Sequence, residues 1–403
     1  MTLPLTGIKV LDFTHLLPGE VCSTVLADLG CEVMRIEPIT PGLGSKLPPI
    51  VEGESLYYWS IHRNKMRIAI DLKHTEGQEI AHKLIQWADA VVENFRPGVM
   101  KRLGISYPEA RKLNEAIVYC SISGYGHDTS WSNRPGHDLN FIAESGVLDV
   151  TRLDENGRPA LPGALISDYM SALYGALAVV SALFAKQSTG QGKHIDISMF
   201  ESALSTQQIM ATALSYLGIS KQQATFRYPS ELPHYSVYEC KDGRHIAIAP
   251  LEAPFWKTFC QKTGMTDLIE HHPVPIYPAL VERFKNLFKT KTLAQWMDVF
   301  DGTNCCVSPV NTIDEALNTI PAVEKSVMAN LEHPTLGPIP QIASPMLSSE
   351  ERKQAFTPVA DSDAAALRLL GELGYTEQQI ARMREEKIIE LRHAERSQKP
   401  TPS

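Results

Sequence analysis

The first third of the chain alternates short strand-like runs with helical periods, and this alternation constrains the fold more than any other feature. Strand-like runs rich in apolar and β-branched residues occupy positions 8–13, 32–37, 67–72, 90–95 and 116–123. Between them, apolar residues recur with a helical period at about 21–29 and 76–87. The pattern predicts an α/β fold with a doubly wound, mostly parallel, Rossmann-like sheet. Such sheets bind ligands at the carboxyl ends of their strands.

The rest of the sequence predicts a second, smaller domain. A long apolar helix from Asp168 and a strand at 194–198 continue the large domain. The polar stretch that follows contains prolines and is typical of a linker. After it, two strand-like runs flank Lys241-Asp242-Gly243, which is a hairpin signal. We therefore expect a large domain at 1–217, a linker at 218–234, a small α+β domain at 235–330, and an extended crossing segment with C-terminal helices at 331–403.

Size and composition narrow the classes of partner. The 403 residues exceed what one hydrophobic core usually supports, and the net charge of -8 argues against nucleic acid. Polar or small residues interrupt the longest apolar run, 172–185, and the N-terminus has no basic region followed by an apolar stretch. We therefore expect no membrane partner. Seven scattered cysteines without a Cys-x-x-Cys motif indicate reduced thiols and a cytoplasmic location.

The usual cofactor fingerprints are missing from the sequence. No Gly-x-Gly-x-x-Gly follows the first strand, and no Gly-x-x-x-x-Gly-Lys-Ser/Thr occurs, so neither a dehydrogenase nor an NTPase is the default interpretation. His271-His272 and His333 stand outside any compact group of Asp, Glu, Cys and His. We therefore expect neither a catalytic metal nor a separate cofactor.

Three residues are candidates for proton chemistry: His137, Asp168 and Glu252. A histidine and a carboxylate that face one carbon from opposite sides can remove one proton and return another. Each residue also has a structural interpretation. His137 could be a satisfied structural histidine, Asp168 could cap the apolar helix that it precedes, and Glu252 could simply begin the next helix.

Six motifs spread over nearly the whole chain are specific in combination. They are Val10-Leu11-Asp12-Phe13, Leu26-Ala27-Asp28-Leu29-Gly30-Cys31-Glu32-Val33, Arg63-Asn64-Lys65, Ile70-Asp71-Leu72-Lys73, Val92-Glu93-Asn94-Phe95-Arg96-Pro97-Gly98 and Leu373-Gly374-Tyr375. With them the chain resembles the class III CoA-transferase and α-methylacyl-CoA racemase superfamily. The resemblance implies an interlaced homodimer, an acyl-CoA thioester substrate bound by the large domain, and a C-terminal segment that returns to that domain.

The resemblance favours the racemase branch. Gly136-His137-Asp138-Leu139-Asn140-Phe141 is similar to a racemase motif, Asp168 matches the catalytic aspartate of both branches, and Glu252 resembles the glutamate that supports the racemase histidine. The implied function is racemisation or epimerisation of 2-methylacyl-CoA thioesters by proton transfer at C2. Tyr169-Met170-Ser171 departs from the glycine-rich run of racemases, which implies a pocket of different shape.

Two other functions share the same scaffold. In a class III CoA-transferase, Asp168 would attack an acyl-CoA thioester and pass CoA to another carboxylic acid through an aspartyl-CoA thioester, with no required role for His137. The glycine-rich loop that transferases carry before the small domain is not recognisable here. A non-catalytic CoA-binding protein would not need His137, Asp168 and Glu252 together.

The positions expected to hold CoA lie at strand ends and in the racemase-like motif. Positive side chains near strand ends suit the phosphates of CoA. Asn94 and Asp71 could instead be ordinary turn residues, and His15 is expected to be structural. The expected CoA-binding residues are Leu17, Pro18, Arg35, Ile70, Asp71, Leu72, Lys73, Asn94, Phe95, Arg96, Arg102, Gly136 and Asp138. CoA would enter as part of the substrate and not as a cofactor.

Overall fold

The chain forms two compact units. The computed structural model describes residues 3–151, 158–220, 232–271, 278–353, 356–357 and 359–391. The large unit holds residues 1–149, 160–208 and 320–403, and the small unit holds 150–159 and 209–319. The small unit therefore begins and ends earlier in the chain than the 235–330 that composition suggested. Most of the predicted linker, 221–231, lies outside the described residues.

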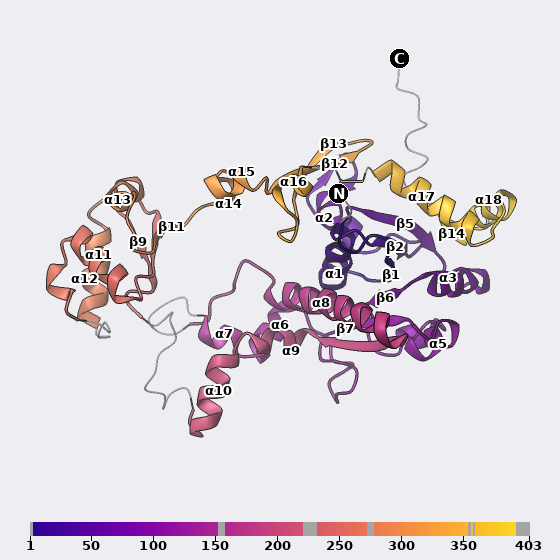
Figure 1. Ribbon diagram of the computed structural model, residues 1–403, viewed down its shortest axis with the longest axis horizontal. Helices are drawn as coiled ribbons and strands as arrows, with labels where there is room; N and C mark the ends of the chain where they lie inside the picture. Colours follow the sequence, from indigo (N-terminus) through magenta and orange to yellow (C-terminus); the bar gives the residue numbers. More distant parts are fainter. Residues whose placement is uncertain are drawn as a thin grey trace, which may run out of the picture. The chain divides into compact units, whose positions relative to one another are not determined.

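A seven-stranded sheet forms the centre of the large unit (Figure 1). In order across the sheet, its strands are β14 (Ile389–Glu390), β5 (Lys65–Ile70), β2 (Glu32–Glu37), β1 (Lys9–Asp12), β6 (Ala90–Glu93), β7 (Val118–Ser123) and β8 (Lys193–Ser198). All neighbours are parallel except β14, which is antiparallel to β5. The predicted mostly parallel sheet is confirmed. Because the chain builds outward from β1 on one side and from β6 on the other, the strand order reverses between them, and doubly wound folds bind ligands at this switch point.

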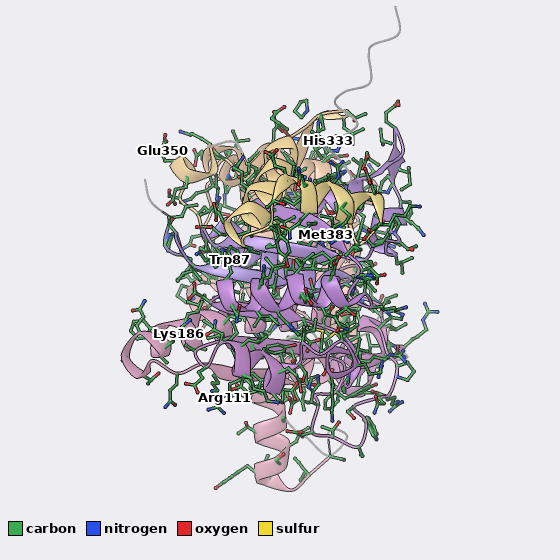
Figure 2. The ribbon with its side chains drawn as sticks, turned by 90° about the vertical axis from the view of Figure 1, so that its right-hand side faces the viewer. Trp87, Arg111, Lys186, His333, Glu350 and Met383 are labelled. Atoms are coloured by element: carbon green, nitrogen blue, oxygen red, sulfur yellow. The ribbon has the colours of Figure 1, made fainter. Side chains whose placement is uncertain are left out.

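Helices cover both faces of the sheet. The first face packs against α3 (Thr75–Trp87), α5 (Tyr107–Leu113), α17 (Val359–Glu372) and α18 (Glu377–Glu385), and the second packs against α1 (Leu17–Asp28) and α8 (Ile166–Thr189). Figure 2 shows the first side, where Met383 of α18 and Trp87 of α3 join one apolar cluster. In β7, Val118 and Cys120 face α1 and α8, whereas Tyr119 between them faces the opposite cluster.

Helix α8 has two different sides. Its buried side packs closely because Gly175 lacks a side chain: a Cβ atom there would lie 3.0 Å from Cδ1 of Ile122 in β7. Its other side exposes Leu173, Leu177 and Phe184. By length and mean hydropathy α8 could span a membrane, but the core helices of globular proteins meet the same criterion. Here the buried side of the helix belongs to the core of the large unit.

The C-terminal segment belongs to the large unit. β12 (Met328–His333) and β13 (Gly337–Ile342) form an antiparallel hairpin where the sequence predicted only an extended crossing segment. At the end of the described chain, Ile389 of β14 pairs with Ile70 of β5, and the Asp71 amide donates to the carbonyl of Ile388 at 2.8 Å. The end of β5, which carries four predicted CoA-binding residues, is therefore held by C-terminal backbone.

The small unit has α+β structure. Its antiparallel sheet consists of β11 (Val307–Pro309), β10 (His245–Ile248) and β9 (Ser236–Glu239), and β9 and β10 form the predicted hairpin. The sequence did not reveal β11, because three residues are too few to show a period. The helices are α10 (Gln208–Leu217), α11 (Ala253–Thr263), η4 (Thr266–Leu268), α12 (Pro278–Phe288), α13 (Leu293–Phe300) and α14 (Ile313–Leu317).

Short elements complete the large unit. They are η1 (Gly44–Lys46), β3 (Ile50–Val51), β4 (Glu54–Ser55), α2 (Leu56–Ser60), α4 (Val99–Arg102), α6 (Asp138–Glu144), α7 (Val147–Val150), α9 (Met199–Ser205), α15 (Ile320–Glu324) and α16 (Ser349–Arg352). After β8 the chain continues as two helices, α9 and then α10 of the small unit.

A buried group of charges joins three strands and one helix at the switch point. This Asp12 network consists of Asp12, Glu20, Arg35, Glu37 and Lys65. Oδ2 of Asp12 lies 3.4 Å from Nζ of Lys65 and 3.5 Å from Nη1 of Arg35, and it accepts a hydrogen bond from the Ser23 hydroxyl at 2.6 Å. Burial raises the pKa of Asp12, but Lys65 and Arg35 outweigh it, so the pKa lies well below its ordinary value. The carboxylate is therefore charged and holds β1, β2, β5 and α1 together.

Replacing Asp12→Asn tests the network. The variant leaves Lys65 and Arg35 buried beside a neutral amide, and we expect the free energy of unfolding to fall by about 3–5 kcal/mol, measured by urea denaturation at pH 7. Glu115→Gln, at an exposed carboxylate, is the control and should change it by less than about 0.5 kcal/mol. An Asp12→Asn variant as stable as the parent would show that the network contributes nothing to stability.

Candidate active site

The starts of two helices in the large unit meet at one carboxylate. Oδ1 of Asp138, the first residue of α6, accepts hydrogen bonds from the Ser167 amide at 2.6 Å, the Ser167 hydroxyl at 2.7 Å and the Asp168 amide at 3.3 Å. Ser167 and Asp168 lie in the first turn of α8, where backbone amides have no partner within the helix. Asp138 therefore caps α8 from α6. It also brings the helix start that carries His137 next to Asp168.

His137 is the residue that precedes α6, and its ring is exposed. Its amide donates to Oδ1 of Asn140 at 3.0 Å, which fixes the backbone at the helix start. Gly136 packs directly on Phe141, since a Cβ atom at 136 would lie 2.7 Å from Cε1 of that ring. This contact explains the glycine before the histidine. A role of Gly136 in binding CoA stays a prediction.

Asp168 is the third residue of α8, and Leu165 occupies the N-cap position. The interpretation of Asp168 as a helix cap is therefore wrong, because α8 begins two residues earlier and Asp138 supplies the cap. The carboxyl of Asp168 is half-buried. Burial, and then the negative charge of Asp138, raise its pKa from 3.8 to about 7. A carboxyl with such a pKa can both accept and donate a proton at neutral pH.

Tyr57 of α2 connects this carboxyl with the switch point. Burial raises the pKa of its phenol, and the charges of Glu20 in α1 and Asp168 in α8 raise it further. The Tyr57 side chain also packs on the cluster that α1 and α8 share. Asp168 therefore lies on the same side of the large unit as the start of α1. Sequence analysis did not identify Tyr57, because a single tyrosine in a five-residue helix forms no motif.

Reciprocal hydrogen bonds join the two loops at the switch point. The His15 amide donates to Oδ1 of Asn94 at 2.6 Å, and the Asn94 side-chain amide donates to the His15 carbonyl. The ring of Phe95 packs edge-on against the His15 ring at 4.6 Å between centroids. Asn94 and Phe95 thus bind the loop after β6 to the loop after β1. The structural role expected for His15 agrees with this arrangement.

The turn from β1 into α1 is strained and tightly packed. Leu16 has φ 63° and ψ 177°, a backbone conformation that essentially only glycine adopts without strain. A Cβ atom at Gly19 would lie 2.5 Å from Cβ of Thr14, so α1 approaches the β1 loop as closely as a glycine allows. Leu17 and Pro18, predicted to contact CoA, are buried in the first turn of α1. Strain of this kind concentrates at ligand sites.

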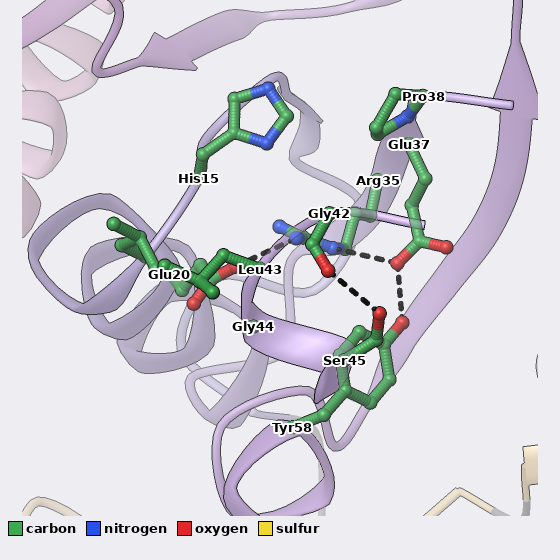
Figure 3. A pocket seen from close by; sticks show the side chains of 11 residues that line it. His15, Glu20, Arg35, Glu37, Pro38, Gly42, Leu43, Gly44, Ser45 and Tyr58 are labelled. Carbon is green, nitrogen blue, oxygen red and sulfur yellow. Dashed lines mark hydrogen bonds and ion pairs between the residues drawn. The ribbon is translucent and has the colours of Figure 1, made fainter. Parts of the chain in front are cut away.

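A cavity of about 180 Å³ opens beside this turn (Figure 3). Arg35 lines it, but its guanidinium is buried and pairs with Glu20 at 2.8 Å and with Glu37 at 3.1 Å. The sequence suggested that Arg35 binds a phosphate of CoA, whereas the structure shows its charge already balanced within the Asp12 network. Oε2 of Glu20 is buried with no hydrogen-bond partner in the described part of the chain. In this cavity, the Glu20 carboxylate therefore has an unused hydrogen-bond acceptor, whereas the positive charge of Arg35 is already paired.

The other predicted CoA-binding residues follow β5 and β6. Ile70, the last residue of β5, is buried, and after it Asp71 and Leu72 are half-buried and Lys73 is exposed. After β6, Arg96 is exposed in the loop before α4 and Arg102 is exposed at the last position of α4. Arg96 lines a different cavity from Arg35. Binding of CoA by these residues stays a prediction. Among the residues that the structure describes, no group of His, Cys, Asp and Glu could hold a metal ion.

Glu252 lies in the small unit, at the N-cap position of α11. Its side chain is exposed and makes no capping hydrogen bond. The Glu252 carboxylate therefore does not stabilise the start of α11 by a hydrogen bond. The predicted support of His137 by Glu252 stays a prediction.

The sequence of this chain places it among known enzymes. A family model described as CoA-transferase family III matches residues 5–362, so the chain belongs to that family. Human succinyl-CoA:glutarate CoA-transferase is 31% identical over 83% of this chain and 78% of its own length. Human alpha-methylacyl-CoA racemase is 29% identical over 96% of this chain and 97% of its own length. Racemases and transferases are thus almost equally similar, so the choice between the two reactions depends on the site.

Solved structures show the same fold. The crystal structure of a CAIB/BAIF family protein from Brucella suis matches 93% of this chain and 100% of its own chain with a TM-score of 0.76, at 24% identity. The likeness supports the architecture of the large sheet and its covering helices.

The contact between Asp138 and Asp168 yields a test of the site's electrostatics. Asp138→Asn keeps an oxygen acceptor for the Ser167 amide but removes the negative charge, so the pKa of Asp168 should fall below about 7, while burial keeps it above its ordinary 3.8. Carboxyl ¹³C chemical shifts of aspartate-labelled protein, assigned by the signal lost in Asp168→Asn, measure this pKa. Glu115→Gln should leave it unchanged. A pKa of about 4 in the unmodified protein would contradict the raised value.

Proposed function

We propose that the protein is a racemase or epimerase of 2-methylacyl-CoA thioesters that transfers a proton at C2. The observation that carries this proposal is the pairing at the two helix starts. The Asp168 carboxyl has a pKa near neutrality, and the Asp138 bond that caps α8 holds it beside the helix that carries His137. Proton transfer in both directions requires a group that exchanges protons readily at the working pH, and the Asp168 carboxyl is such a group.

The chemistry follows from the acidity of the thioester. One of the two residues removes the C2 proton, the electron pair moves to the thioester oxygen as an enolate, and the other residue donates a proton to the opposite face of C2. The positive end of the α8 dipole would stabilise the enolate oxygen, since Asp138 already accepts hydrogen bonds from the Ser167 and Asp168 amides. Glu252 would hold the tautomer of His137 and favour its charged form. No cofactor takes part, since CoA arrives with the substrate.

The switch point would hold the CoA part of the substrate. Its strained turn at Leu16, the buried first turn of α1 and the exposed cations after β5 and β6 form one edge of the sheet, where ligands of this architecture bind. Tyr57 lies near Asp168 and Tyr169, since the charges of both residues raise the pKa of the Tyr57 phenol. The bulk of the two tyrosines would narrow the space for the acyl group, as the departure at Tyr169-Met170-Ser171 suggests.

A CoA-transferase is the second candidate, favoured by the similarity to succinyl-CoA:glutarate CoA-transferase. The Asp168 carboxylate would attack the thioester carbonyl and release CoA thiolate, leaving a mixed anhydride. The thiolate would then attack the aspartyl carbonyl, release the first acid and form an aspartyl-CoA thioester, from which a second acid would take CoA through a second anhydride. A pKa of about 7 keeps part of Asp168 protonated at neutral pH and disfavours this role.

We propose a homodimer, in which one chain covers the apolar stripe on α8. Leu173, Leu177 and Phe184 recur at helical spacing on this side, and the Phe184 side chain is 76% exposed. An exposed stripe of large apolar side chains on a long helix is typical of a surface that another chain covers.

We also propose a cytoplasmic location. Cysteines that form no disulfide among the described residues support it.

Deuterium exchange tests the proposed reaction. A panel of 2-methylacyl-CoA thioesters in deuterium oxide should gain deuterium at C2 without an acceptor acid, as followed by mass spectrometry. His137→Ala and Asp168→Asn should each slow exchange by about 100-fold or more, since each removes one proton-transfer group. His271→Ala, at an exposed histidine of the small unit, should leave the rate unchanged. CoA transfer to an added acid that depends on Asp168 but not on His137, without exchange, would establish the transferase instead.

Light scattering during gel filtration tests the dimer. The protein should elute with twice the mass of one chain, and Leu177→Arg should shift it toward monomer because the arginine would be buried against apolar side chains of the second chain. Met346→Arg, at another exposed apolar residue outside α8, is the control and should remain dimeric. A parent protein that elutes as a monomer would refute the proposal, and circular dichroism would confirm that each variant is folded.

A further inference from the structure

A second polar cavity lies on the opposite face of the large sheet from α8. It has a volume of about 250 Å³ and is lined, among others, by Glu93, Arg96, Lys101, Ser121, His127 and His194. Ser121 and His194 alternate with Cys120 and Ile195, which face α1 and α8, so they point to the other side of the sheet. The cavity is therefore separated from Asp168 by the sheet itself. The site proposed above uses none of its polar side chains except Arg96.

The floor of this cavity is a connected polar group. The Glu93 side chain is 2% exposed, and its Oε2 accepts a hydrogen bond from the Phe95 amide at 2.8 Å. Ser121 hydrogen-bonds to Glu93, and its Oγ lies 3.1 Å from Nε2 of His194. Burial raises the pKa of Glu93 to about 7, so near neutral pH the floor is partly protonated and carries less negative charge than its composition suggests.

The walls carry donors and positive charges that the described protein does not use. Nε2 of His127 is buried without a hydrogen-bond partner among the described residues, although the backbone amide of His127 donates to Asp196 at 2.7 Å. Arg96 and Lys101 make no ion pair within the described chain. A buried ring nitrogen without a partner costs free energy, which a ligand in the cavity would recover.

We propose that this cavity is a separate binding site for a phosphate-sized oxyanion. The guanidinium of Arg96 and the ammonium of Lys101 match a doubly charged tetrahedral anion, and the His127 ring supplies a further donor. At the floor the Ser121 hydroxyl can donate or accept, and Glu93 in its protonated form does not oppose the anion. The volume accommodates a phosphate but not the whole of CoA.

Calorimetric titration of the full-length protein with inorganic phosphate tests the site. The titration is made with CoA present in excess, so that a switch-point site for CoA is occupied. We expect saturable binding of one phosphate per chain. The double variant Arg96→Gln/Lys101→Gln should weaken it by about tenfold or more, and His127→Asn should weaken it as well. The matched pair Arg111→Gln/Lys112→Gln removes the same charges from α5, outside the cavity, and should bind phosphate as the parent does.

Three results would overturn the proposal. The first is the absence of saturable binding. The second is binding that survives Arg96→Gln/Lys101→Gln, which would place the phosphate elsewhere. The third is binding seen only without CoA, combined with weaker CoA binding in that double variant, which would make the cavity part of the CoA site. None of these results depends on whether the enzyme is a racemase or a transferase, so the two proposals fail independently.

Discussion

The buried ion pairs of Asp12 are the interaction on which the large unit depends. Its carboxylate lies at the end of the central strand β1 and meets Lys65 from β5 and Arg35 from β2. Removing such charges from water is costly, and mutual attraction offsets that cost only when every partner is present. The arrangement therefore fixes the register of these three strands relative to one another. Because Glu20 of α1 joins through Arg35, it also sets where the first helix begins.

The position of α1 in turn shapes the switch point. The chain leaves β1, passes Leu16 in a conformation suited to glycine, and enters α1 beside Thr14 with no room for a side chain at Gly19. Such strain persists only where neighbouring contacts over-determine the backbone. The Asp12 network, which joins β1 to α1, and the hydrogen bonds between His15 and Asn94 supply those contacts. The predicted CoA site is thus rigid at the point where the two halves of the sheet meet.

A second carboxylate, Asp138, organises the candidate chemistry. It satisfies the amides at the start of α8 and also stands near the half-buried Asp168, so one group provides both a helix cap and an electrostatic effect. Burial of the Asp168 carboxyl, and then the negative charge of Asp138, raise its pKa to about 7. An aspartate in this state is suited to proton exchange at carbon. This property supports the racemase more than the transferase, at nearly equal sequence identity to both.

Local pattern determined the sheet, its strands and helices, and the family, because the period of apolar residues and short motifs are properties of neighbouring positions in the chain. The roles of charged residues were not determined in this way. Arg35, expected to bind a phosphate of CoA, pairs with Glu20 and Glu37, and its binding of CoA stays a prediction. For Asp168 the sequence left a helix cap as the alternative to catalysis, and Asp138 takes that capping position. Likewise, β14 pairs with β5 across more than three hundred residues. Only the tertiary structure decided these points, since a charge's pKa and partners depend on which distant residues surround it in space.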